Sequence, residues 1–228
     1  MFGSLLLLLT LVLNSWTWQL VKQNLFLAFI LLTITISLFA LTFAAEKSLR
    51  KIAFLVLLLT FCVGSFYFLQ GNFDRSLREK NPTEVSIALK RHGYFAEGLG
   101  KLFTNKFSLQ FFSNWYYPIT NYSRNISYSI DPNLYFFMSH PREKSGIDEF
   151  GKYSPLLLPV FLLGLFTHFL SLSKYKTLTA YLITAIIITG FATPYYKLGP
   201  VFLFPYLNLI IVLGGINFLN FVRKKYET

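Results

Sequence analysis

The 228-residue chain is 54% hydrophobic and only 14% charged, whereas a soluble domain carries about 25% charged residues. This composition excludes an ordinary soluble globular protein and indicates that lipid forms part of the surroundings. The net charge of +11 does not indicate nucleic acid as a partner, because the cations lie in short clusters beside apolar runs, where they act as topology signals. The lone Cys62 excludes an intrachain disulfide.

Six apolar runs predict six membrane helices, since roughly 17–25 mostly apolar residues cross a bilayer as a helix. The runs are Leu5–Leu20, Leu25–Ala45, Ile52–Leu69, Pro155–Leu172, Leu178–Thr193 and Val201–Val222. The first run could instead be a signal peptide, but it lacks a basic n-region and a clear cleavage site. Trp16 and Trp18 suit the interfacial belt of a retained helix. The fold class predicted is therefore an all-α polytopic membrane protein.

One long polar insert, residues 71–152, separates an N-terminal unit of three helices (1–70) from a C-terminal unit of three helices (153–228). It holds 11 of the 21 Lys/Arg and 8 of the 10 Asp/Glu. We expect a mixed insert that is poor in β structure. Residues 72–80 read as a charged loop, and the aromatic and β-branched residues of Phe107–Tyr128 favour a short strand or two. Asn121 and Asn125 match glycosylation triplets, which are frequent by chance, and we expect neither to be modified.

A broken amphipathic pattern follows Pro82 within the insert, with Thr83 as the expected N-cap. Gly93, Gly98 and Gly100 interrupt it. The pattern fits an interfacial helix on the outer leaflet, and it fits equally an ordinary helix packed on the membrane domain.

The short links between the predicted helices differ in charge. One set of links, with the C-terminal tail, holds eight cations, and the opposite set holds only Lys22 and Lys197. The positive-inside rule then places both termini in the cytoplasm and residues 71–152 outside it, most simply at the plasma membrane. Long translocated segments are exempt from this count, so the cations of the insert do not contradict the orientation.

Proline, glycine and polar residues mark the last three predicted helices. Pro159 and Pro205 lie deep enough to be expected to kink their helices, and Gly190 and the pair Gly214-Gly215 favour close helix approach. His168 is by default a functional hypothesis because it is ionisable within a membrane helix. We expect instead a neutral imidazole bonded to a neighbouring helix, and interhelical hydrogen bonds from Asn208 and Asn217.

No metal site or cofactor is predicted. His92, His140 and His168 lie far apart in the sequence, without cysteine or paired acids at ligand spacing. The segment Asp131–Gly146 is more distinctive, because it is turn-rich, then aromatic, then carries His140, Arg142 and Lys144 before the fourth helix. Such cations suit a phosphate-bearing lipid headgroup or a pyrophosphate. The alternative is a solvated loop beside the membrane.

Two further stretches complete a recognisable order of features. The fourth helix begins Pro-Leu-Leu-Leu-Pro-Val-Phe-Leu-Leu-Gly-Leu (Pro155–Leu165). The last two helices are linked by Thr-Pro-Tyr-Tyr-Lys-Leu-Gly-Pro (residues 193–200), and the chain continues Val-Phe-Leu-Phe-Pro-Tyr-Leu (Val201–Leu207). Over Phe107–Leu219 this order resembles the C-terminal half of the polytopic membrane glycosyltransferases of the protein-mannosyltransferase and aminoarabinose-transferase type.

The resemblance implies sugar transfer from a polyprenyl-phosphate donor on the outer side of the membrane. Two departures limit it. Tyr195-Tyr196-Lys197 stands in place of the family's Arg-Tyr pair, and the link Val21–Asn24 contains no acid where the family keeps its catalytic carboxylates. Set against the family that it resembles, the chain is therefore expected to lack the catalytic half, and we assign no catalytic residue. Asp131, Asp148 and Glu149 are the acids nearest the helix mouths, but none is assigned to catalysis.

The sequence leaves three functions to compare. The first is a truncated or split glycosyltransferase-like protein that binds a polyprenyl-phosphate sugar beside a second, catalytic membrane chain. Its substrate-binding residues would be His140, Arg142, Lys144, Tyr195, Tyr196 and Lys197. The second is a non-enzymatic membrane subunit whose insert docks a partner protein. The third, a transporter, is disfavoured because no acid lies in any predicted span and no inverted repeat is visible.

Overall fold

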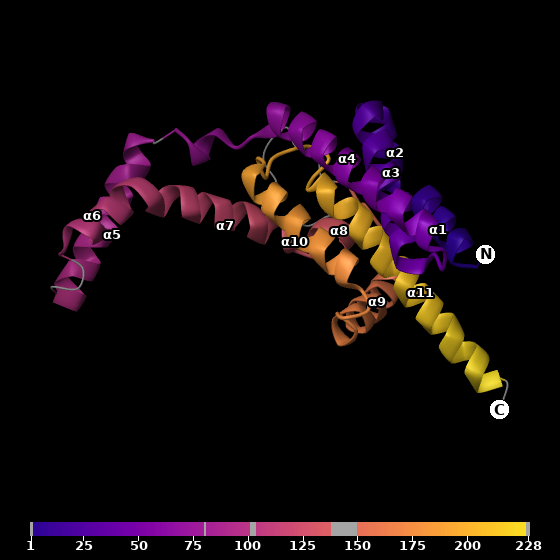
Figure 1. Cartoon of the computed structure of the whole chain (residues 1–228). Coiled ribbons are helices and arrows are strands. Elements are labelled where there is room, and N and C mark those ends of the chain that lie inside the picture. The colour runs from indigo at the N-terminus through magenta and orange to yellow at the C-terminus, as the bar shows by residue number, and fades with distance from the viewer. Residues whose placement is uncertain (1, 80, 101–103, 138–149, 227–228) are drawn as a thin grey trace.

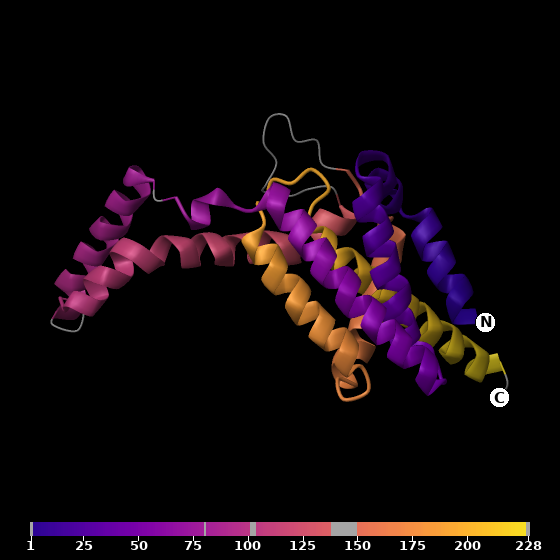
Figure 2. The same cartoon turned by 45° about the horizontal axis from the view of Figure 1, so that its top comes forward.

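The computed structural model describes residues 2–79, 81–100, 104–137 and 150–226. Within these residues every regular element is a helix, and the one β pairing is an isolated bridge between Phe73 and Ala192. A bundle of apolar helices carries an arm that projects sideways from one end, across the direction of the long helices (Figures 1 and 2).

The bundle contains seven of these helices. They are α1 (Phe2–Leu13), α2 (Ser15–Gln23), α3 (Leu25–Phe43), α4 (Lys47–Asn72), α9 (Leu158–Leu170), α10 (Lys176–Phe191) and α11 (Phe204–Tyr226). The arm consists of α5 (Pro82–Leu99), α6 (Lys106–Gln110), a π-helical turn (Phe111–Trp115) and α7 (Tyr116–Ile130). Short helical turns connect them: η1 (Arg75–Leu77), α8 (Asn133–Phe136), η4 (Pro155–Leu157) and η5 (Val201–Leu203).

Three helices in the described part of the chain are long and apolar enough to cross a membrane: α3, α4 and Val201–Lys225, which joins η5 to all but the last residue of α11. The pair α1 and α2, bent by 62° at Asn14, makes a fourth if it counts as one span. Helices Pro155–Leu170 and Lys176–Phe191 are apolar but shorter. The prediction of an all-helical membrane protein is confirmed at this level.

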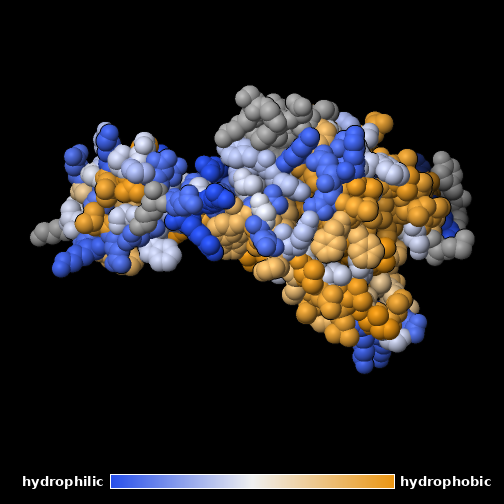
Figure 3. Space-filling model, turned by 90° about the horizontal axis from the view of Figure 1, so that it is seen from above, coloured by the Kyte–Doolittle hydropathy of each residue, from blue (hydrophilic) through white to orange (hydrophobic). Residues whose placement is uncertain are grey.

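The outer surface of the bundle is itself evidence for lipid. Large apolar side chains of α4 point away from the protein, with Leu55 67% and Phe66 74% exposed. Soluble monomers rarely expose contiguous apolar surface of this extent, because contact with water is unfavourable. Figure 3 shows hydrophobic residues over much of the bundle, whereas the arm mixes hydrophilic and hydrophobic residues.

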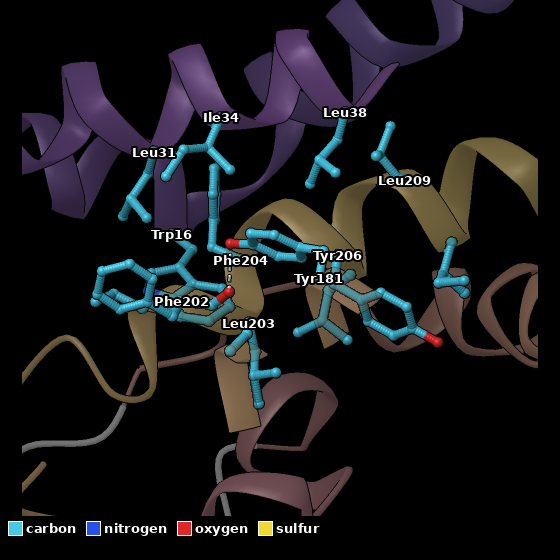
Figure 4. Packing of buried hydrophobic residues seen from close by; sticks show 14 of the residues in the cluster. Trp16, Leu31, Ile34, Leu38, Tyr181, Phe202, Leu203, Phe204, Tyr206 and Leu209 are labelled. Carbon is cyan, nitrogen blue, oxygen red and sulfur yellow. Dashed lines mark hydrogen bonds between the residues drawn. The ribbon is translucent and has the colours of Figure 1, made fainter. Parts of the chain in front are cut away.

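The core is centred on η5 and the first half of α11, which are buried against α3, α2 and α10 (Figure 4). The Trp16 side chain is fully buried, and its ring contacts the Phe204 ring edge-on at a centroid distance of 5.4 Å. The Tyr181 hydroxyl donates to the Phe202 carbonyl oxygen at 2.8 Å. Residues from both sides of the insert therefore share one core.

Polar groups inside the bundle are bonded between helices, as predicted. The His168 ring nitrogens lie 3.0 Å from the Thr179 hydroxyl of α10 and 3.1 Å from the Tyr206 hydroxyl of α11. The Asn217 amide donates to the Thr167 hydroxyl of α9 at 3.1 Å. A buried polar group in an apolar bundle is costly unless it is paired, and these pairings explain how His168 and Asn217 are tolerated.

The two deep prolines do not kink their helices, contrary to expectation. Pro159 lies in the first turn of α9, and Pro205 is the second residue of α11, after the separate turn η5. A first-turn proline costs little, because its missing N–H has no partner in the helix. The position of the helix start, which the apolar run alone does not specify, decides the effect of each proline.

The arm is helical throughout its described residues, and the predicted strand in Phe107–Tyr128 is wrong. Helix α5 begins at Pro82, with the Asn81 side chain rather than Thr83 as its cap, and ends at Leu99, which is followed by Gly100 with φ 60°. The π-helical turn buries Phe112 against the rings of Phe95 and Tyr116. These contacts give the arm a small core of its own.

Candidate functional site

Three of the predicted substrate-binding residues lie on the loop of residues 192–200, which is tied to the end of α4. They are Tyr195, Tyr196 and Lys197. The Thr193 N–H donates to the Asn72 carbonyl oxygen at 2.8 Å, and the Asp74 N–H donates to the Phe191 carbonyl oxygen at 2.9 Å. Gly199 turns the loop with φ 77°, a value that favours glycine because it has no Cβ. The start of the loop is therefore tied to the end of α4.

The three predicted side chains differ in environment. Tyr196 is half-buried, and its ring meets the Phe68 ring of α4 edge-on at 5.2 Å between centroids. Burial, with a smaller effect from Tyr67, raises the pKa of the Tyr196 hydroxyl, so at neutral pH the hydroxyl keeps its proton and can donate to an anion. Tyr195 is half-buried, and Lys197 is exposed.

The other three predicted residues, His140, Arg142 and Lys144, lie outside the described residues. The chain on either side of them is well defined. The Tyr153 N–H donates to the Tyr135 carbonyl oxygen at 2.9 Å, and the Trp16 ring packs on Tyr135 at 5.6 Å between centroids. The Trp16 indole N–H donates to the Leu198 carbonyl oxygen at 2.8 Å. One tryptophan therefore contacts both the base of the basic segment and the loop 192–200.

A hollow of about 620 Å³ lies beside the C-terminal end of α4, at the same end of the bundle as the loop 192–200. It is lined by Phe66, Leu69, Gln70, Gly71, Phe73, Arg75, Arg78 and Glu79. The Arg78 guanidinium lies 4.7 Å from the centre of the Phe73 ring, a cation–π contact that holds it at the wall. Arg75 is exposed. Two arginines next to apolar side chains of α4 combine donors that suit phosphate with a surface that faces lipid.

A second hollow, of about 420 Å³, continues from the first toward the arm. Arg78 and Glu79 line both, and Trp115 and Tyr117 line the second. Burial and the nearby Glu84 carboxylate raise the pKa of the Tyr117 hydroxyl. Arg78 thus borders the bundle hollow and the arm hollow together.

Sequence reasoning placed Arg75 and Arg78 in a charged loop and missed them as site residues. Their signal was two arginines, three residues apart, directly after a long apolar run. The sequence did not indicate that the turn η1 would set this pair beside the exposed face of α4.

A buried hydrogen-bond network joins the arm to the bundle next to these hollows. Asp74 is 9% exposed, and its two carboxylate oxygens accept from the Asn125 amide at 2.8 Å and the Ser76 N–H at 3.0 Å. The Asn125 amide also lies 3.2 Å from the Gly190 carbonyl oxygen of α10. The Asn121 amide donates to the Ser76 hydroxyl at 3.1 Å. Both glycosylation-triplet asparagines are thus buried and bonded through the nitrogen that a glycan would need.

Acidic groups are few at this end of the bundle. One Asp131 oxygen accepts the Asn133 N–H at 2.9 Å at the start of α8, and Asp148 and Glu149 lie outside the described residues. No three His, Cys, Asp or Glu side chains of residues 2–79, 81–100, 104–137 and 150–226 gather as a metal site. The described residues of the two hollows offer cations and hydroxyls to an anion, with Glu79 as their one carboxylate.

Comparisons with known proteins found no match to this chain among protein-family models, curated proteins or solved structures.

Proposed function

We propose that the chain is an integral membrane protein that binds a polyprenyl-phosphate sugar at the outward end of its bundle and acts beside a separate catalytic chain. The observation that carries this proposal is the hollow in which Arg75 and Arg78 adjoin the exposed apolar face of α4. A polyprenyl phosphate has the two matching parts, a phosphate for the arginines and a long hydrocarbon for the lipid-facing surface. The resemblance to the C-terminal half of polyprenyl-phosphate-dependent glycosyltransferases supports the same ligand.

The proposal includes a topology of six spans. Helix α10 has 16 residues and would be about 24 Å long, shorter than the roughly 30 Å hydrocarbon core. Local thinning of the bilayer accommodates such a mismatch at modest cost. The cation bias of the short links puts both termini in the cytoplasm of a plasma-membrane protein, and the arm and the two hollows outside.

Further donors complete the proposed site. Lys197, exposed on the loop 192–200, and the segment with Arg142 and Lys144 would contact the remaining phosphate or sugar oxygens. The Tyr195 and Tyr196 rings would border the headgroup. No residue of the chain is proposed as a catalytic acid or base, so transfer requires the second chain.

Binding of polyprenyl phosphate to the purified full chain in nanodiscs tests the proposal, with retained lipid measured by native mass spectrometry. We expect Arg75→Gln with Arg78→Gln to weaken binding by at least about ten- to a hundredfold, since the loss of even one charge-assisted hydrogen bond costs about 1.5–3 kcal/mol. Lys47→Gln, an exposed cation at the other end of α4, is the matched control and should bind like the wild type. Equal retention by the double variant and the control would contradict the proposal.

A second candidate function is supported by the surface of the arm. Tyr94 is 77%, Phe107 78% and Trp115 60% exposed, and the arm reaches well beyond the bundle (Figure 1). Exposed aromatic clusters suit protein contacts, so the arm of a non-enzymatic subunit would dock a partner. Photocrosslinking from position 94 in membranes distinguishes the two: one recurrent protein adduct, together with normal function of the arginine variant, favours the docking subunit.

A further inference from the structure

A separate cationic cavity lies at the opposite end of the bundle from the arm, where α3 ends and α4 and α10 begin. It has a volume of about 390 Å³, within the roughly 300–1,000 Å³ range of small-molecule sites. Arg50 comes from α4, Lys174 from the turn that precedes α10, and Lys176 from the first residue of α10, more than a hundred residues later. Twenty residues of α4 separate Arg50 from Gln70 of the Arg75 hollow, a helical rise of about 30 Å, so it is a different site.

The lining of this cavity suits an anion. Besides the three cations, it presents the hydroxyl-bearing residues Ser173 and Thr177, and none of its described lining residues is acidic. The Lys174 ammonium lies 5.4 Å from the centre of the Tyr175 ring, which limits its freedom at the rim. Helix α10 begins here without a side-chain cap, so the N–H groups of its first turn add to the positive potential.

The charge is not explained by topology alone. The positive-inside rule accounts for the number of cations on one side of a membrane, but it does not require that cations from two distant links line one cavity. Like charges gathered in a partly enclosed space repel each other. Glu46 is the acid nearest in sequence to Arg50. It does not line the cavity, and its carboxylate instead accepts from the Ser48 hydroxyl. A bound anion would offset the repulsion.

An apolar groove of two shallow hollows continues from the cavity along α4, the first between α3 and α4 and the second between α4 and α10. A hollow of about 440 Å³ shares Leu41 and Arg50 with the cavity and adds Lys51, Phe54 and Leu55. A further hollow of about 210 Å³ shares Phe54 with it and runs past Leu58 to the foot formed by Phe61 and Tyr181. The rings of Phe61 and Tyr181 meet edge-on at 5.7 Å and close the groove at its base. The cationic cavity therefore adjoins an open, largely apolar surface that can hold hydrocarbon.

We propose that this cavity and groove bind one anionic glycerophospholipid, with its phosphate among Arg50, Lys174 and Lys176 and an acyl chain along the α4–α10 seam. The chemistry recognised is a phosphate ester, and the groove selects the lipid form over a free phosphate. A lipid here would fill the seam between α4 and α10, where the Phe61 and Tyr181 rings meet. The inference does not depend on the function proposed for the outward end.

Native mass spectrometry of the full chain from nanodiscs of phosphatidylglycerol and phosphatidylcholine tests the headgroup. The wild type should retain phosphatidylglycerol preferentially, and Arg50→Gln with Lys174→Gln should reduce that retention by about ten- to a hundredfold. Lys47→Gln is the matched control, because it removes a cation from the same helix end without lining the cavity. Arg50→Lys with Lys174→Arg keeps the charges and should restore retention. Equal retention of both lipids, or an unchanged double Gln variant, would overturn the proposal.

Two further experiments distinguish a lipid from a free phosphate: competition with soluble phosphates, and quenching that locates the acyl chain. Glycerol phosphate and inorganic phosphate should displace phosphatidylglycerol only at a large excess, because they lack the acyl chain. Quenching by phosphatidylglycerol brominated on its acyl chain should reach a tryptophan introduced by Leu58→Trp, and should fall in the Arg50→Gln, Lys174→Gln background. Displacement by free phosphate at equal concentration would show that the groove contributes nothing, and the lipid assignment would then be rejected.

Discussion

The buried Asn14 amide donates to the side-chain oxygen of Asn208 at 3.2 Å and so joins the break between α1 and α2 to α11. The same Asn14 amide reaches the Thr10 carbonyl oxygen at 2.6 Å, and the Asn14 oxygen accepts the Thr17 N–H at 2.7 Å. Asn14 thus caps α2, and its amide also donates to the Thr10 carbonyl oxygen, which the bend leaves without a helical partner. Asn208 was predicted to bond between helices, and Asn14 is the partner that makes the bend stable in an apolar core.

Asn208→Leu should destabilise the bundle by about 1–2 kcal/mol, because it removes an acceptor from a buried donor. Asn217→Leu is the comparison: its amide is only partly buried, so the loss should be smaller. Unfolding in mixed micelles, followed by fluorescence of the buried Trp16, measures both. A wild-type midpoint for Asn208→Leu would contradict the role given to the pair.

Gly164 and Gly214 mark the closest approach of α9 and α11. A Cβ on Gly164 would lie 2.0 Å from the Ile210 carbonyl oxygen, and one on Gly214 would lie 1.9 Å from that of Val160. Either Gly→Ala variant should therefore push the helices apart and cost about 1–3 kcal/mol or more. Gly93→Ala in α5, where a Cβ meets nothing within 4 Å, should be neutral or stabilising by up to about 1 kcal/mol. Equal effects of Gly164→Ala and Gly93→Ala on the unfolding midpoint would refute the close packing.

Asn125→Asp should detach the arm in a pH-dependent way. The new carboxylate would face the Asp74 carboxylate across a 2.8 Å contact, and two adjacent carboxylates raise the pKa of one of them. The folded pKa is then above the unfolded value of about 4, so stability is retained at low pH and lost as pH rises through the raised pKa. Limited proteolysis of the arm between about pH 4 and 7 measures the change.

Asn121→Asp provides the control for that variant. Its amide contacts the Ser76 hydroxyl, which can donate to a carboxylate instead of accepting from an amide. Proteolysis of this variant should therefore vary much less with pH. Parallel pH profiles for the two variants would argue against a special Asp74–Asn125 contact.

Tyr153→Phe should change the response to alkaline pH. Burial, with the neighbouring Tyr135, raises the pKa of the Tyr153 hydroxyl well above its ordinary value. The unfolded chain therefore loses this proton first, near pH 10, and the folded state loses stability as pH rises above that value. The variant should lose less stability between about pH 9 and 11. At neutral pH it should match or exceed the wild type, since the hydroxyl has no hydrogen-bond partner among the described residues.

Tyr94→Phe, at an exposed position of the arm, is the control for Tyr153→Phe. Its unfolding midpoints, measured over the same pH series, should follow those of the wild type. Superimposable midpoints for all three proteins would mean that Tyr153 does not contribute to the alkaline transition.

Hydropathy predicted the apolar helices of the bundle because a helix in contact with lipid must be apolar along most of its length. The run Leu25–Ala45 corresponds to α3 (Leu25–Phe43) within two residues. The same physics predicted that His168 and Asn217 would each bond to a neighbouring helix, since a polar group in an apolar helix needs a hydrogen-bond partner. Only the identity of each partner required the structure.

The arm and the cation sites were less predictable, for two physical reasons. The aromatic content of Phe107–Tyr128 favoured a strand, but the buried Asn121, Asn125 and Ser129 recur every four residues, which is the period of one helix face. The cavities depend on contacts between distant segments, as where Arg50 and Lys174 line one space. No local pattern in the sequence indicates such a convergence.

The arm also has a mechanical consequence. Helix α7 is one continuous rod whose inner end is bonded to Gly190 through Asn125 and packed on that glycine through the Tyr122 ring. Gly190 lies two residues before the loop 192–200. A force on the outer end of the arm would therefore tilt α7. The tilt would in turn move the loop 192–200, which carries Tyr195, Tyr196 and Lys197.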